Sequence, residues 1–118
     1  MMIKRKITDP FNVEFEPFDN YGSVIPGMSW HKITYSKDTG KGTYILKMEP
    51  GSKSTLHEHK NFEEFYILDG ELIDPDNKIF TKGDLVTYEP GSIHSSYTKK
   101  GCLILVFMRG MNKPIKTT

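Results

Sequence analysis

The residues of this chain best suited to chemistry are its histidines, of which there are four. His57 and His59 are separated by one residue, and side chains at that spacing project from the same face of a β-strand. Both imidazoles can therefore reach one interior site, which is the arrangement of a metal chelate. His94 lies in a later strand-like segment and could enter the same interior from another direction.

Two adjacent acids, Glu63 and Glu64, follow the histidine pair. Strand alternation allows only one of the two carboxylates to face the interior. Three neutral imidazoles and one carboxylate suit Fe(II), Mn(II), Ni(II), Co(II) or Zn(II), and an octahedral ion would keep two positions for water, substrate or dioxygen. We therefore expect one divalent transition metal ion, whose identity this ligand set does not decide.

The elements that must position these residues are predicted to be β-strands. Alanine is absent, while ten glycines and seven prolines divide segments rich in β-branched and aromatic residues. The segments recur at intervals of about 8–12 residues, as in a sandwich or barrel. Asp69-Gly70, between two such segments, predicts a tight hairpin turn. The expected strands are 30–35, 43–48, 55–59, 63–68, 71–73, 78–80, 85–88, 94–98 and 102–108.

A short internal repeat supports this organisation. The tetrapeptide Glu-Pro-Gly-Ser occurs at residues 49–52 and again at 89–92, each time before a segment that contains histidine. Proline followed by glycine suits the two central positions of a type II turn. We interpret the repeat as two similar groups of strands that each send one strand to a shared interior.

The chain divides into an N-terminal arm (1–29), a barrel (30–110) and a polar tail (111–118) that we expect to be mobile. The arm contains short apolar pieces, including Phe11, Phe15 and Phe18, which would suit a subunit interface. We therefore expect a homodimer.

Several classes of protein are disfavoured. The formal net charge is +1, so no nucleic-acid partner is expected. The longest apolar run, Cys102–Met108, has seven residues against the roughly 20 of a membrane span, so no membrane partner is expected either. The single cysteine cannot form an internal disulfide, and no apolar segment follows the charged N-terminus. These features favour a cytoplasmic location.

With these motifs in view, the sequence resembles the cupins. Their two glycine- and histidine-containing motifs are matched here by Gly51, His57, His59, Glu63 and Gly70, and by Gly83, Gly91 and His94. Two positions depart from the pattern, because Glu89 stands where proline is expected and Thr98 where asparagine is expected. The resemblance implies an all-β double-stranded β-helix, a jelly-roll-like barrel of two antiparallel sheets. It also implies His57, His59, Glu63 and His94 as metal ligands, and so favours Glu63 over Glu64.

Within the cupins, residues 63–70, 91–94 and 101–106 resemble ChrR-type anti-sigma-factor cupins and their single-domain relatives. That resemblance implies two functions. The first is a metal-dependent, dioxygenase-like enzyme acting on a small organic substrate, with Glu64 and Tyr97 as candidates for an acid–base role. The second is a non-catalytic module that binds or senses a metal or a small-molecule ligand. An enzyme needs a metal with open positions beside a cavity, whereas a structural zinc site is usually closed.

Overall fold

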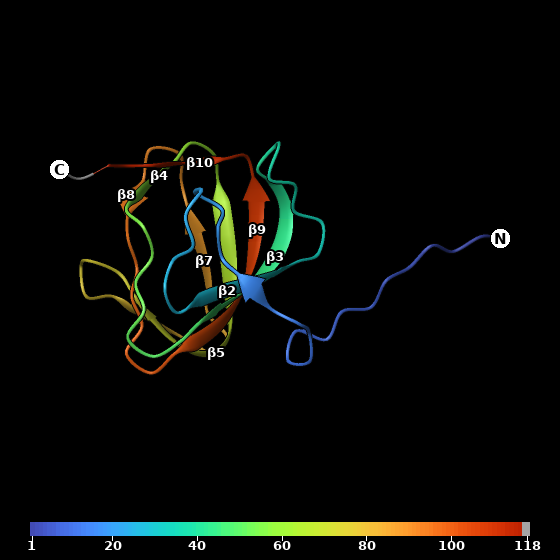
Figure 1. Ribbon diagram of the computed structural model, residues 1–118, viewed down its shortest axis with the longest axis horizontal. Coiled ribbons are helices and arrows are strands. Elements are labelled where there is room, and N and C mark those ends of the chain that lie inside the picture. The colour runs from blue at the N-terminus through green and yellow to red at the C-terminus, as the bar shows by residue number, and fades with distance from the viewer. Residues whose placement is uncertain (117–118) are drawn as a thin grey trace.

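The computed structural model describes residues 1–116, which form ten strands and no helix (Figure 1). This confirms the predicted all-β class, and no helix is long and apolar enough to span a membrane among these residues. The strands are β1 (Glu16–Pro17), β2 (Met28–Lys32), β3 (Lys41–Met48), β4 (His57–His59), β5 (Glu63–Ile73), β6 (Ile79–Thr81), β7 (Leu85–Tyr88), β8 (Ile93–His94), β9 (Cys102–Arg109) and β10 (Asn112–Pro114).

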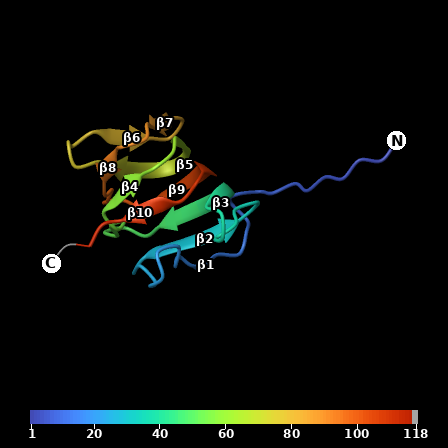
Figure 2. The ribbon, with the colours of Figure 1, turned by 90° about the horizontal axis from the view of Figure 1, so that it is seen from above.

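The strands form two antiparallel sheets, as the resemblance to cupins implied. The larger sheet has the order β1-β2-β3-β9-β5-β6, with β7 also paired to β5. The smaller sheet has the order β10-β4-β8 and carries the three histidines of interest. Seen from above, β8, β4 and β10 lie beside the long strands β5, β9 and β3 (Figure 2).

The core lies against the inner face of the larger sheet. Alternate residues of β9 are buried, as expected for a strand with one face turned to the interior. The residues of the core cluster are Phe18, Met28, Trp30, Tyr35, Tyr44, Leu46, Met48, Phe65, Ile67, Leu72, Cys102, Ile104, Val106 and Met108.

The predicted hairpin at Asp69-Gly70 is wrong. Residues 63–73 form one continuous strand, β5, whose pairing with β9 shifts register between Ile67 and Asp69. Gly70 does adopt the positive φ of 80° that a hairpin turn would use, but it lies within β5 and pairs with Cys102, just after the register shift between Ile67 and Asp69. A Cβ atom at this position would lie 2.0 Å from the carbonyl oxygen of Gly101, so the strands could not pair as they do.

The repeated Pro-Gly turns are present and nearly identical. Gly51 and Gly91 have φ values of 87° and 95°, the left-handed conformation that a type II turn requires. In the second turn the amide of Gly91 donates to the carbonyl of His59 at 2.7 Å. This turn therefore fixes the end of the histidine-bearing strand β4.

Both ends of the chain contribute strands beside residues 30–110. β1 pairs with β2, and β10 pairs with β4 in register with His57 and His59. Phe18, just after β1, is buried in the core, whereas residues 1–9 run away from the rest of the molecule (Figures 1 and 2). Residues 117–118 of the predicted tail lie outside the described residues.

Candidate metal centre

The structure brings together three of the residues that the sequence singled out. His57 and His94 are register partners on β4 and β8, and His59 follows on the same face of β4. Each ring offers one nitrogen such that the three nitrogens lie within 4.8 Å of one another, and all three side chains are buried. We call these residues the histidine cluster.

Two of the rings are held by hydrogen bonds through their Nδ1 atoms. Nδ1 of His57 lies 2.6 Å from the carbonyl oxygen of Thr55, and Nδ1 of His94 lies 2.9 Å from Oδ1 of Asp74. A carbonyl or carboxylate oxygen can only accept, so Nδ1 carries a proton in both rings. In the neutral form of such a ring Nε2 keeps a free lone pair, which is the form that binds a metal.

Asp74 contacts the histidine cluster but was not singled out from the sequence, because residues 74–77, Asp-Pro-Asp-Asn, have the composition of a turn. Its carboxylate accepts hydrogen bonds from His94 at 2.9 Å, from the Ser96 hydroxyl at 2.6 Å and from the Tyr88 hydroxyl at 2.6 Å. Burial opposes ionisation of this group, but the three hydrogen bonds outweigh it and hold the pKa of Asp74 below its usual value. Asp74 therefore presents an ionised acceptor to His94.

His59 differs from the other two, because neither ring nitrogen has a hydrogen-bond partner although the side chain is fully buried. Its Nδ1 lies 3.5 Å from Oε1 of Glu63, and its ring stacks on Tyr88 with centroids 4.8 Å apart. A buried polar atom without a partner costs free energy. A metal ion bound by one of these nitrogens would remove part of that cost, so the residues fit the metal that the sequence predicts.

The protonation states also suit a cation. Burial lowers the pKa of His57 to about 4 and the pKa of His59 to about 3, because a charged imidazolium is poorly solvated in this interior. Both rings are therefore neutral at pH 7. Metal binding would then require no deprotonation of either ring.

Glu63 lies beside the histidine cluster and not within it. The side chain is buried on β5, and its Oε1 accepts a hydrogen bond from Nδ2 of Asn112 at 2.9 Å. Burial raises the pKa of Glu63 to about 7, although the hydrogen bond from Asn112 works in the other direction. Glu63 as a fourth ligand remains a prediction.

The two candidates for acid–base chemistry lie elsewhere. Glu64 occupies a partly exposed position, where it accepts from Arg109 at 2.6 Å and from the hydroxyl of Thr87 at 3.3 Å. Strand alternation predicts such an outward position for one of the two adjacent acids. Tyr97 forms isolated bridges with Lys53 and Ile73 and does not line the cavity described next.

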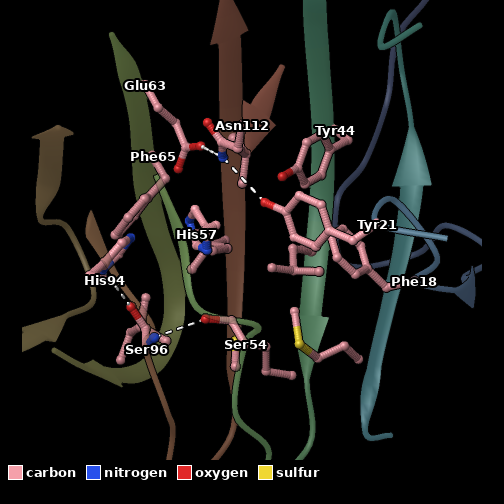
Figure 3. Close-up of a pocket in the computed structure, with 16 residues that line it drawn as sticks. Phe18, Tyr21, Tyr44, Ser54, His57, Glu63, Phe65, His94, Ser96 and Asn112 are labelled. Carbon is pink, nitrogen blue, oxygen red and sulfur yellow. Dashed lines mark hydrogen bonds between the residues drawn. The ribbon is translucent and has the colours of Figure 1, made fainter. Parts of the chain in front are cut away.

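A cavity of about 50 Å³ adjoins the histidine cluster (Figure 3). Two of its polar residues were not found from the sequence. Tyr21 belongs to the segment between β1 and β2, and Asn112 begins β10, so 91 positions separate two side chains that share a hydrogen bond. No spacing rule connects them. The cavity is lined by Phe18, Tyr21, Met28, Tyr44, Leu46, Met48, Ser54, His57, Glu63, Phe65, Leu72, His94, Ser96, Ile104, Val106 and Asn112.

Solved structures share this architecture at low sequence identity. An acetylacetone dioxygenase from Acinetobacter johnsonii is 17% identical, with a TM-score of 0.72 over 98% of this chain and 85% of the other. The polyketide cyclase RemF from Streptomyces resistomycificus is 18% identical, with a TM-score of 0.72 over 99% and 88% of the two chains. An RmlC-like cupin from Ralstonia eutropha is 14% identical, with a TM-score of 0.77 over 97% and 74%. At these identities the likeness establishes a shared cupin fold.

Sequence comparison identifies the family more closely. No curated protein sequence matches the chain. The family described as the ChrR cupin-like domain, however, matches residues 6–112 and so includes β1, the histidine cluster and the first residue of β10. The chain therefore belongs to the family of ChrR cupin-like domains.

Proposed function

We propose that this protein is a mononuclear metal-dependent enzyme, dioxygenase-like in its chemistry, that acts on a small organic molecule. The observation that carries the proposal is the position of the histidine cluster at the wall of a cavity. His57 and His94 both line that cavity, so a cation bound by them would face space that a small molecule can enter. A purely structural zinc site would need no such space.

The roles of the protein's own residues follow from their contacts. A divalent transition ion bound by the three histidines would supply a Lewis acid with positions free for substrate and dioxygen. Asp74 and the Thr55 carbonyl orient the rings of His94 and His57, so that little rearrangement is needed for binding. The apolar residues of the cavity wall would pack against the carbon atoms of a substrate held there.

Membership of the ChrR-type family favours a second candidate function, a non-catalytic module that binds or senses a metal or small ligand. Both candidates use the same histidine cluster. They differ in whether dioxygen is consumed when metal and substrate are supplied together, which makes oxygen uptake the discriminating measurement.

The test uses the full chain purified without oxygen and loaded in turn with Fe(II), Mn(II), Co(II), Ni(II) and Zn(II). Oxygen uptake is then followed against diketones, phenols and thiols, with acetylacetone included because one protein of the same fold is named for it. We expect uptake with at least one redox-active metal and one class of substrate. A protein that binds one metal per chain but takes up no oxygen with any combination would contradict the enzymatic proposal and favour the sensing module.

Two variants control this assay. The double substitution His57→Ala/His59→Ala should abolish stoichiometric metal binding and oxygen uptake together, because it removes two of three converging ligands. His31→Ala is the matched control, since His31 lies outside the histidine cluster and bonds the carbonyl of Glu14 at 3.0 Å. It should leave metal binding and uptake unchanged.

A further inference from the structure

One corner of the cavity carries hydrogen-bonding groups, whereas most of the wall is apolar. Figure 3 shows the hydroxyls of Tyr21 and Tyr44 pointing toward each other near the amide of Asn112, with the carboxylate of Glu63 beyond it. We call these four residues the polar corner. They come from β3, β5, β10 and the segment between β1 and β2.

The hydrogen bonds of the polar corner leave the hydroxyl hydrogen of Tyr21 unused. Nδ2 of Asn112 donates to Oε1 of Glu63 at 2.9 Å and to the Tyr21 hydroxyl at 3.3 Å, which accounts for both of its N–H groups. Tyr21 is the acceptor in that bond. No hydrogen bond donated by the Tyr21 O–H is present among residues 1–116, so this hydrogen is available to a molecule in the cavity.

Tyr44 provides the stronger observation. The side chain is only 5% exposed, its hydroxyl is aimed into the cavity, and it makes no hydrogen bond within residues 1–116. This hydroxyl is not one of the fully buried polar atoms without a partner, so it is open to the cavity, where a water can be its partner. A ligand with an acceptor oxygen that entered the cavity would replace that water and accept a hydrogen bond from Tyr44.

The chemistry of that molecule follows from the groups that would meet it. A tyrosine hydroxyl remains protonated at neutral pH, so both tyrosines would donate to an acceptor oxygen. At the polar corner the described chain supplies no lysine or arginine and has the acid Glu63, so a carboxylate or phosphate held there, away from the predicted metal, would have no basic side chain to pair with. A volume of about 50 Å³ compares with roughly 10–15 Å³ for one water, which restricts the ligand to a few heavy atoms.

We propose that the polar corner binds the carbonyl oxygen of a small, uncharged and mainly apolar molecule, with the Tyr44 hydroxyl as the principal hydrogen-bond donor and Tyr21 as the second. The conversion of this molecule rests on the proposed function, but its binding does not. Tyr44 is thus a ligand-selecting residue, separate from the histidine cluster that would hold the metal.

The test compares two probes of nearly the same planar shape, acetone and 2-methylpropene, of which only acetone carries an acceptor oxygen. Binding to the full chain is measured by saturation-transfer NMR under argon, in both the metal-free and the Zn(II)-loaded protein. Tyr44→Phe should weaken acetone binding about threefold to tenfold, as expected for one hydrogen bond, and leave 2-methylpropene binding unchanged. Tyr66→Phe removes the same hydroxyl from an exposed position and should change neither.

Thermal unfolding and metal stoichiometry are measured to detect a misfolded variant. Tyr44→Phe should lower neither, because the hydroxyl that it removes faces the cavity. Equal acetone affinity in the wild type and Tyr44→Phe would overturn the proposal, as would equal weakening of both probes. Since only binding is scored, absence of oxygen uptake would refute the enzymatic proposal and leave this result intact.

Discussion

The role assigned to Asp74 leads to a prediction about a residue that would not itself bind the metal. Its carboxylate accepts hydrogen bonds from His94, Ser96 and Tyr88. In Asp74→Asn the side chain keeps its shape but has one acceptor oxygen, while its NH₂ group can only donate. At least one of the three donors then loses its acceptor, and an oxygen that still faces His94 belongs to a neutral amide instead of a carboxylate.

The expected loss can be worked out from these contacts. A hydrogen bond to a charged group contributes about 1.5–3 kcal/mol, so the free energy of unfolding of Asp74→Asn should fall by about that amount. Groups that orient a metal-binding histidine typically contribute about 10- to 100-fold in metal affinity. We therefore expect Zn(II) affinity at pH 7 to fall by roughly 10- to 100-fold, because the pKa of Asp74 lies below its usual value and the carboxylate is ionised there.

The assay is competition with a chromogenic chelator, combined with chemical denaturation of the same samples. Asp76→Asn is the matched control, because Asp76 is exposed in the same turn and accepts only from the backbone amide of Lys78 at 3.1 Å. Ser96→Ala removes one hydrogen-bond donor to Asp74 without adding a new one, and it should lower the affinity for Zn(II) less than Asp74→Asn does. If Asp74→Asn and Asp76→Asn bound Zn(II) equally well, the proposed orientation of His94 by Asp74 would be refuted.

Two further predictions concern pH and assembly. In the metal-free protein the folded pKa values of His57 and His59, about 4 and about 3, lie below the ordinary 6.5, so their contribution to stability is lost as pH falls below 6.5. Glu63 has the opposite effect: its pKa is raised from 4.5 to about 7, so its contribution to stability is lost as pH rises from 4.5 through 7. Between pH 4.5 and 6.5 the free energy of unfolding of Glu63→Gln should therefore depend more steeply on pH than that of the wild type, by up to one proton. An unchanged slope would contradict this. For assembly, Ile3 and Ile7 are 60% and 85% exposed on a segment that runs away from the molecule, so light scattering should give twice the mass of the chain. Deletion of residues 2–9 should yield a monomer that still binds metal, whereas a monomeric full-length chain would refute the predicted homodimer.

The histidine cluster could be foreseen because its geometry depends on short-range rules. His57 and His59 share a face of β4 through strand alternation alone. The Pro-Gly turns are equally local, since proline and glycine each impose their own backbone angle. The repeat and the family resemblance were then sufficient to predict that His94, on the partner strand β8, lies near them.

The error at Asp69-Gly70 shows where local rules stop. A positive φ at Gly70 is compatible with both a hairpin turn and an irregular position within a continuous strand. The outcome is decided by β9, which pairs with β5 on both sides of the irregularity and so keeps the strand continuous. That pairing joins residues more than 30 positions apart, and no pattern within β5 reports it.

Asp74, Tyr21 and Asn112 were missed for the same reason, because contacts between distant parts of the chain place them at the site. The position of Tyr21 and Asn112 in the chain also has a consequence for function. The three histidines come from β4 and β8, whereas Tyr21 and Asn112 come from segments outside residues 30–110. Changes in these outer segments can therefore alter the groups that face a bound molecule while leaving the histidines in place. A fold built this way can keep one metal-binding geometry and vary the molecule bound next to it, which is why ligand choice in this protein should be sought at Tyr21, Tyr44 and Asn112.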